Sequence, residues 1–359
     1  MTTRREVLQL GAGAVTLSVA GAGHSASEPA AKKLDLLVLG GTGFIGPHQI
    51  DTALARGHRV TVFNRGRRAG LFGGRVEELV GDRDARVGDG LKALAGTRSW
   101  DAVIDNSGYV PRHVRDSAEL LKGRVGRYLY ISTVAVYDFE AATHFTEAGP
   151  LAALEDPAVE EVNNKTYGPL KAECDLLVRQ IFGDGCTIVR PTYIVGPGDS
   201  SDRFTYWVAR IHRGGDVLTC AHPDYEIAWV DVRDLCSWVI EALERDLPGT
   251  FNSSGPASPV TRAGLMWGLR AMTAAPVNFH WPSDELLVEL KIAPPMLGAP
   301  PRHFANAASI AAGHQYRSLA NSARDTLTWW QAQPADRRAT ARGWISSEQE
   351  REAIVRLTS

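Results

Sequence analysis

Cysteine is scarce in this chain of 359 residues. The four that occur, Cys174, Cys186, Cys220 and Cys236, have neither the density of a disulfide scaffold nor the spacing of metal ligands. We therefore expect them to be core or helix residues, and we expect no metal site. An excess of charge is missing too, because 39 lysines and arginines against 41 acidic residues leave a formal net charge of −2. This balance gives no electrostatic reason to expect a nucleic-acid or membrane-surface partner.

Long, strongly apolar runs are also lacking. An uncharged stretch from Val7 to Ser27 is rich in glycine, alanine and valine, and its hydrophobicity is modest for a membrane-spanning helix. It overlaps Thr3-Arg4-Arg5-Glu6-Val7-Leu8-Gln9, which resembles a twin-arginine export signal, and small residues permit cleavage after Ala22 or near Ala26. We interpret residues 1–30 as a twin-arginine signal peptide. An uncleaved membrane anchor and a disordered N-terminus are the alternatives.

Export by this route carries three expectations. The export machinery is a partner of the chain, the protein is periplasmic or otherwise extracytoplasmic, and the mature protein has no stable membrane span. Over the whole chain, 44% hydrophobic and 22% charged residues are typical of an ordinary soluble globular protein. The length suits one large domain or two modest ones.

What the chain does have is a glycine-rich stretch from Leu34 to Gly46. An apolar run predicts a strand here, and a helix should follow to about Arg56, before a second strand over residues 59–64. Glycines three apart suit a tight turn, close approach of the backbone to a pyrophosphate, and close packing of the helix on the strand. The free N–H groups of the helix would face the phosphates. The predicted dinucleotide cradle consists of Gly40, Thr42, Gly43, Phe44, Ile45 and Gly46.

The residues after the next strands indicate which dinucleotide is bound. Asn64-Arg65 stands where an acidic residue would bind the ribose 2′-hydroxyl of NAD, and an arginine suits a 2′-phosphate, so we expect NADP, with NAD as the alternative. Asp82 follows a third strand over residues 76–80 and could accept a hydrogen bond from the adenine amino group or cap a helix. Ser107 lies in a polar turn after a fourth strand over residues 100–105. Because reduced nicotinamide is not expected outside the cytoplasm, the cofactor should be tightly bound and regenerated in each cycle.

Hydroxyl and lysine side chains follow in an order that suits proton transfer. Ser132 and Thr133 stand at the end of a fifth strand over residues 127–132, and Tyr167 and Lys171 are four apart, so they share one face of a helix. An ammonium close to a phenol stabilises the phenolate and lowers its pKa, which would let tyrosine exchange a proton with an alcohol or carbonyl. An amphipathic helix surface is the alternative interpretation of the tyrosine and lysine.

Taken together, these segments resemble the short-chain dehydrogenase/reductase superfamily, and specifically its extended epimerase/dehydratase branch. The matching stretches run over residues 40–46, 130–137, 167–171, 190–199 and 229–235. The resemblance implies an α/β fold with a doubly wound Rossmann parallel sheet over residues 34–190. A smaller C-terminal substrate lobe over residues 191–359, interleaved with the sheet, should follow, and a homodimer through the helices flanking Tyr167 is a family expectation.

The resemblance also implies roles for single residues. Tyr167 would be the catalytic acid and base, Lys171 would bind the nicotinamide ribose and tune the tyrosine, and Thr133 would orient the substrate oxygen, with Ser132 as the alternative hydroxyl. Pro191 and Tyr193 would line the nicotinamide end of the cleft. Candidates for substrate contact in the C-terminal lobe are Asp202, Arg203, Tyr206, Trp207, His222 and Arg262.

Departures from the family pattern narrow the expected chemistry. Val134 and Ala135 replace the acidic pair that the family's dehydratases carry after the strand-end hydroxyl, so elimination is less supported. The polar turns after the second and fourth strands resemble an atypical bacterial branch related to chloroplast stem-loop RNA-binding proteins. We expect an NAD(P)-dependent oxidoreductase or epimerase that acts on a secondary alcohol or ketone of a sugar-like substrate by tyrosinate-assisted hydride transfer. The alternatives are an RNA-binding protein and a non-catalytic dinucleotide-binding protein.

Overall fold

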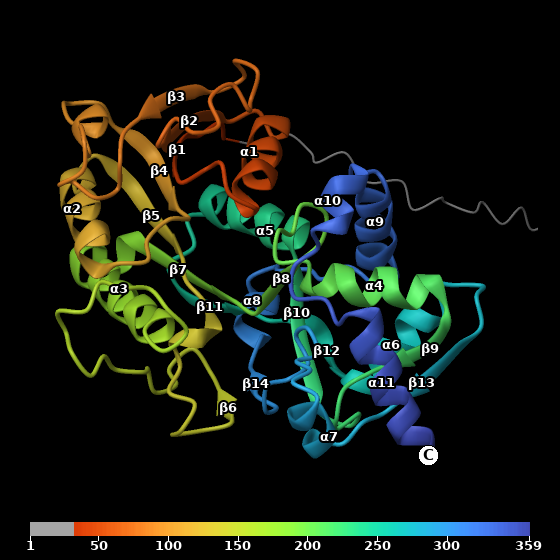
Figure 1. Cartoon of the computed structure of the whole chain (residues 1–359). Helices are drawn as coiled ribbons and strands as arrows, with labels where there is room; N and C mark the ends of the chain where they lie inside the picture. The colour runs from red at the N-terminus through yellow and green to blue at the C-terminus, as the bar shows by residue number, and fades with distance from the viewer. Residues whose placement is uncertain (1–31) are drawn as a thin grey trace, which may run out of the picture.

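The computed structural model describes residues 32–359 (Figure 1). The predicted signal peptide and its cleavage sites lie outside the described residues. Within residues 32–359, no helix has the length and apolar character needed to cross a membrane. The four cysteines are buried and free, as expected for core and helix residues.

A sheet of seven parallel strands forms the centre of the protein. Its strands are β1 (Asp35–Leu39), β2 (Arg59–Asn64), β3 (Glu77–Val80), β4 (Trp100–Asp105), β5 (Val125–Ile131), β7 (Cys186–Pro191) and β11 (Gly249–Ser253). They lie in the order β11-β7-β5-β4-β1-β2-β3. From β1 the chain adds strands first on one side and then on the other, so the strand order reverses at β1. The expected α/β class with a doubly wound parallel sheet is therefore confirmed.

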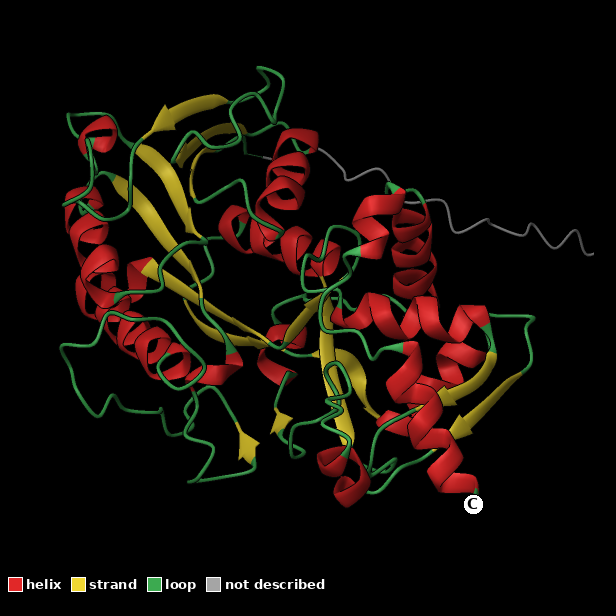
Figure 2. Ribbon diagram, viewed as in Figure 1, coloured by secondary structure: helices red, strands yellow, loops and turns green. Residues whose placement is uncertain are grey.

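Helices cover both faces of this sheet (Figure 2). On one face lie α1 (Ile45–Ala55) and α5 (Val232–Glu244), and on the other lie α2 (Pro111–Leu121) and α3 (Tyr167–Phe182). Side chains of a strand alternate between faces, so Leu36 and Val38 of β1 enter the core beneath α1 and α5, whereas Leu37 and Leu39 enter the core beneath α2 and α3. Both cores are clusters of buried aliphatic and aromatic residues, which explains why these strands read as apolar runs.

The carboxyl ends of the central strands lie level with one another. Leu39 of β1 pairs with Phe63 of β2 on one side and with Asp105 of β4 on the other. The loops that follow β1, β2 and β4 therefore leave the sheet at one edge. In an open parallel sheet this edge, at the point where the strand order reverses, is where ligands bind.

A second group of elements packs beside the sheet. A three-stranded sheet of β12 (Gly255–Thr261), β10 (Glu226–Asp231) and β8 (Tyr193–Val195) adjoins a core shared by α4 (Arg203–Arg213), α6 (Arg262–Arg270) and α9 (Leu319–Gln331). The smaller elements are β6 (His144–Phe145), β9 (Gly215–Leu218), β13 (Val277–His280), α7 (Asp284–Glu289), β14 (His303–Phe304), α8 (Ala307–Ala311), α10 (Ala335–Ala339) and α11 (Ser347–Thr358). β11 belongs to the main sheet and α5 packs on it, although both come from the C-terminal half of the chain. The N-terminal and C-terminal halves therefore interleave.

Candidate active site

The loop between β1 and α1 has the geometry that phosphate binding needs. Gly40 has φ +83°, and a Cβ there would lie 2.6 Å from the Cβ of Ser107. A Cβ at Gly46 would lie 2.2 Å from the carbonyl oxygen of Gly41, whereas a Cβ at Gly43 would meet nothing within 4 Å. The first turn of α1 carries no acidic side chain, and Phe44 provides no side-chain cap. Its N–H groups are therefore open to an anion, and Gly43 leaves room for one.

The end of β2 presents a buried donor beside this loop. The side-chain oxygen of Asn64 accepts a hydrogen bond from the N–H of Gly66 at 2.6 Å. Its side-chain nitrogen is buried and has no partner within the described part of the chain. An unpaired buried donor at this edge fits a ligand oxygen. Arg65, the predicted partner of a 2′-phosphate, is exposed, and Arg68 donates a hydrogen bond to the carbonyl oxygen of Thr42 at 2.7 Å.

A buried ion pair supports the loops after β3 and β4. Arg83 contacts Asp105 at 2.5 Å and donates a hydrogen bond to the hydroxyl of Ser107 at 3.0 Å. Burial opposes ionisation of Asp105, but the charge and hydrogen bonds of Arg83 hold the pKa of this carboxyl below its ordinary value. Asp82, the predicted adenine contact, accepts a hydrogen bond from the N–H of Asp84 at 2.9 Å. The sequence did not predict Arg83 as a support, because its partners lie at the end of β4, in the next loop and in α2.

Tyr167 begins α3 and stands next to Thr133, as the sequence order predicted. Burial and the neighbouring Tyr109 raise the pKa of Tyr167 to about 12, although a hydrogen bond with Thr133 acts in the opposite direction. Lys171 is buried, and its ammonium donates hydrogen bonds to the carbonyl oxygens of Gly108 at 2.8 Å and Ile131 at 2.7 Å. Burial lowers the pKa of Lys171 to about 8. The expected lowering of the tyrosine pKa by Lys171 is therefore not seen, because the ammonium faces backbone carbonyls.

A second buried ion pair fixes α3 against the sheet. Arg190 of β7 contacts Asp175 of α3 at 2.8 Å, and it donates a hydrogen bond to the hydroxyl of Tyr137 at 3.0 Å. Arg190 and Asp175 are both almost fully buried. Since Asp175 lies one helical turn after Lys171, this pair sets the position of the helix face that carries Tyr167 and Lys171.

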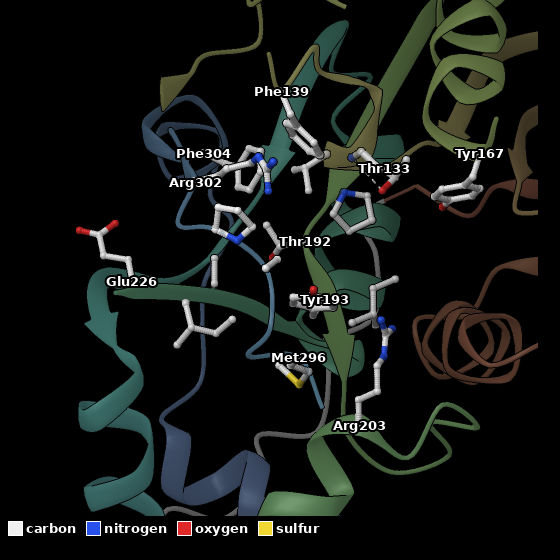
Figure 3. Close-up of a pocket in the computed structure, with 18 of the residues that line it drawn as sticks. Thr133, Phe139, Tyr167, Thr192, Tyr193, Arg203, Glu226, Met296, Arg302 and Phe304 are labelled. Atoms are coloured by element: carbon white, nitrogen blue, oxygen red, sulfur yellow. Dashed lines mark hydrogen bonds between the residues drawn. The ribbon is translucent and has the colours of Figure 1, made fainter. Parts of the chain in front are cut away.

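A cavity of about 430 Å³ opens beside Tyr167 (Figure 3). Predicted residues that line it are Ser132, Thr133, Tyr167, Pro191 and Tyr193, together with Phe44 of the glycine loop. Figure 3 shows Thr133 and Tyr167 at one side of the cavity and Glu226 at the opposite side. The hydroxyl pair, the tyrosine and the start of the cradle therefore face one space.

Three arginines border the same cavity. Arg203 lies over the ring of Tyr193 with 4.8 Å between guanidinium and ring centre, and Arg302 lies over the ring of Phe139 at 3.9 Å. Arg262 is buried, and it donates hydrogen bonds to the carbonyl oxygens of Ala221 and Ala299. Aromatic and cationic side chains thus alternate on this wall.

Only part of the predicted substrate contacts reach the cavity. Arg203 and Arg262 line it, whereas Asp202, Tyr206 and Trp207 are buried without lining it, and His222 pairs with Asp284 at 2.7 Å. Residues that the sequence analysis missed are Phe139, Glu226, Arg302 and Phe304. They lie in three separate segments of the chain, and no spacing in the sequence indicates that these segments meet.

Comparisons with known proteins agree with this arrangement. The profile of the "NAD dependent epimerase/dehydratase family" matches residues 36–253. Among solved structures, UDP-glucuronic acid 4-epimerase from Bacillus cereus in complex with NAD shares 15% identity, with a TM-score of 0.60 over 82% of this chain and 98% of that chain. The Bordetella bronchiseptica enzyme WbmG in complex with NAD and UDP shares 15% identity, with a TM-score of 0.61 over 84% of this chain and 95% of that chain.

One curated relative carries a different description. The chloroplast stem-loop binding protein of 41 kDa b from Arabidopsis thaliana is 26% identical over 242 residues, which are 63% of this chain and 60% of that protein. The chain therefore matches about three fifths of that relative's length. The family profile covers most of the seven-stranded sheet and both sides of the Tyr167 site. This chain belongs to the NAD dependent epimerase/dehydratase family.

Proposed function

We propose that the protein is an NADP-dependent oxidoreductase or epimerase that acts on a secondary alcohol or ketone of a sugar-like substrate. The observation that carries this proposal is the shared space beside Tyr167. Thr133 and Tyr167 line the cavity together with Phe44, which adjoins the dinucleotide cradle. A substrate carbinol held in this cavity can therefore meet both a phenol and the nicotinamide end of the cofactor site.

The bound nicotinamide supplies the hydride acceptor and donor. The chain's own residues handle the proton and the orientation of the substrate. Thr133 lines the same cavity as Tyr167, where its hydroxyl can position the substrate oxygen beside the phenol. With a pKa of about 12, Tyr167 holds its proton at neutral pH, which suits donation to a ketone oxygen. In the oxidation of an alcohol, the deprotonated Tyr167 phenol would take the hydroxyl proton. A bound nicotinamide would accept the hydride and, in an epimerase, would supply it again to the other face of the ketone.

The cavity wall supports a substrate that combines a polyol with a negative charge. Arg203 and Arg302 bring cations to a wall that also carries Phe139 and Tyr193, and rings of this kind stack on sugar faces. The related structures bind UDP or are named for UDP-sugars. We therefore propose a sugar linked to an anionic group, with a nucleotide sugar as the first candidate.

Residues at the end of β2 favour NADP as the cofactor. The leader favours a cofactor that stays bound through many turnovers. Asn64 offers an unpaired donor, and Arg65 and Arg68 follow it directly at the end of β2. The twin-arginine-like leader motivates the further proposal of an extracytoplasmic protein, which gains from a cofactor that does not dissociate. A homodimer through the helices beside Tyr167 remains part of the proposal.

The test compares the wild type with Tyr167→Phe during a single turnover. Each protein is loaded with NADP and mixed with a panel of nucleotide sugars, and the absorbance of reduced nicotinamide is followed. The wild type should show reduction with at least one sugar. Tyr167→Phe should retain the nucleotide and lose reduction by about a thousandfold, because the general base is gone. Equal rates would reject the acid and base assignment.

The curated stem-loop binding relative supports an alternative, binding of structured RNA. The near-neutral charge of the chain argues against it, since RNA binding draws on a positive surface. A gel-shift titration with a labelled stem-loop RNA at low salt decides between the two. Saturable binding that persists in Tyr167→Phe would favour the RNA-binding function.

A further inference from the structure

Arg112 joins two loops at the carboxyl edge of the main sheet. It lies in the first turn of α2, directly after the loop that leaves β4. Its guanidinium contacts Asp84 through two hydrogen bonds of 2.7 and 3.2 Å. The same guanidinium contacts Glu160 through two hydrogen bonds of 2.7 and 2.8 Å. We call this arrangement the Asp84–Arg112–Glu160 clasp.

The two acidic partners belong to segments on either side of the cofactor site. Asp84 follows Asp82 in the loop after β3, on the adenine side of the predicted site. Glu160 belongs to residues 152–166, which we call the strap; it leads into α3 and ends next to Tyr167 (Figure 1). The clasp therefore ties the adenine side of the edge to the segment that positions Tyr167.

The strap is held to a neighbouring segment at its start, closed by a turn of its own at its end, and clasped between them. At its start, the N–H of Ala152 donates to the carbonyl oxygen of Val136 at 2.8 Å. At its end, the side chain of Asn163 accepts hydrogen bonds from the N–H groups of Lys165 and Thr166 at 2.9 and 3.1 Å. Among the described residues, Glu160 is the strap residue whose side chain is hydrogen-bonded to another element.

The strap carries more negative than positive charge, so the cation of Arg112 matters for where the strap lies. The strap has four carboxylates, those of Glu155, Asp156, Glu160 and Glu161. It has one ammonium, that of Lys165. An acidic segment that joins the adenine side of the predicted site to Tyr167 would be repelled by a cofactor with several phosphates, unless a cation neutralises the contact. Arg112 provides that cation, and its guanidinium lies between the two carboxylates. Its side chain is only 15% exposed, so solvent screens the clasp less than an isolated surface pair.

We propose that the Asp84–Arg112–Glu160 clasp holds the strap closed along the cofactor site and thereby slows release of the bound dinucleotide. Arg112 is a positioning residue in this account, because it acts through the strap. The inference rests on the proposed function, since it requires that the protein binds NADP or NAD. Opening of the clasp would free residues 152–166 without unfolding α2 or α3, because the strap has no regular secondary structure of its own.

The experiment measures how fast labelled NADP leaves the full-length mature protein when excess unlabelled NADP is added. Arg112→Gln removes the clasp, and Arg115→Gln removes an equal charge from an exposed position on the same helix. Glu160→Gln and Glu161→Gln form a second matched pair in the exposed strap, where folding is not at risk. Arg112→Gln and Glu160→Gln should each release NADP roughly fivefold faster than the wild type, and both controls should release it at the wild-type rate.

Three further readouts separate the clasp from a general loss of structure. Raising the salt concentration should speed release from the wild type and leave Arg112→Gln unchanged, because the screened contact is already absent. Hydrogen exchange of the nucleotide-free proteins should be faster over residues 152–166 in Arg112→Gln than in Arg115→Gln. Arg112→Lys should restore part of the slow release.

The outcomes distinguish the two levels of the proposal. If the wild type binds neither NADP nor NAD, the proposed function fails and the clasp fails with it. If the wild type binds the dinucleotide and Arg112→Gln releases it no faster than Arg115→Gln, the clasp alone is overturned.

Discussion

The glycine loop allows a prediction that separates packing from ligand binding. A side chain at Gly46 would collide with the backbone, whereas a side chain at Gly43 would enter open space. A methyl group at Gly46 would lie 2.2 Å from the carbonyl oxygen of Gly41, and this neighbour is rigid backbone. An ordinary contact needs more than 3 Å, so the loop or α1 would have to move by about an ångström. Gly46→Ala should therefore destabilise the fold by about 3 kcal/mol and disturb the loop.

Gly43 should behave differently. A methyl group there would meet no atom within 4 Å, and the residue is exposed. Gly43→Ala should therefore change the free energy of unfolding by less than about 0.5 kcal/mol. The same methyl group would occupy the space where phosphates approach the N-terminus of α1. It should weaken NADP binding by about tenfold or more.

The assay combines urea denaturation with titration of NADP for the two variants and the wild type. The expected result is a stability defect for Gly46→Ala and a binding defect without a stability defect for Gly43→Ala. Wild-type stability of Gly46→Ala would refute the packing argument. Wild-type NADP affinity of Gly43→Ala would refute the placement of the phosphates on this loop.

Three further predictions concern the buried network, pH and cofactor choice. Asp175→Asn leaves Arg190 buried without its carboxylate and should lower the free energy of unfolding by about 3 kcal/mol in urea denaturation, which an unchanged midpoint would contradict. Burial lowers the pKa of His314 to about 4 from an ordinary 6.5, so the unfolded chain takes up the proton first. The wild type should therefore lose up to about 3 kcal/mol as pH falls from 6.5 towards 4, and denaturation of His314→Gln across this range should lack that component. Arg65→Asp should shift binding preference from NADP towards NAD in competitive titrations, and an unchanged ratio would remove this reason for choosing NADP.

The fold could be predicted largely because its signals are local. β1, the glycine loop, α1 and β2 follow one another within about thirty residues, and strands buried on both faces read as apolar runs. The observed bounds differ from the predicted ones by one or two residues at β3 and β5. The sheet of β8, β10 and β12 was not predicted, because its strands lie far apart in the sequence.

The candidate site was predictable in its chemistry and less so in its contacts. Thr133 and Tyr167 meet as their order suggested, but Lys171 donates to the carbonyl oxygens of Gly108 and Ile131. Those carbonyls belong to the loop after β4 and to β5, and no spacing within α3 indicates them. Cavity residues such as Arg302 were missed for the same reason, since only tertiary packing brings them beside Tyr167.

The central claim is that this chain holds a nicotinamide dinucleotide and uses it repeatedly. The most direct measurement is to purify the protein from the cells that make it, denature it, and identify the released nucleotide by mass spectrometry. We predict NADP in close to one-to-one ratio with the protein. A protein that is empty and also binds neither NADP nor NAD on titration would contradict the claim.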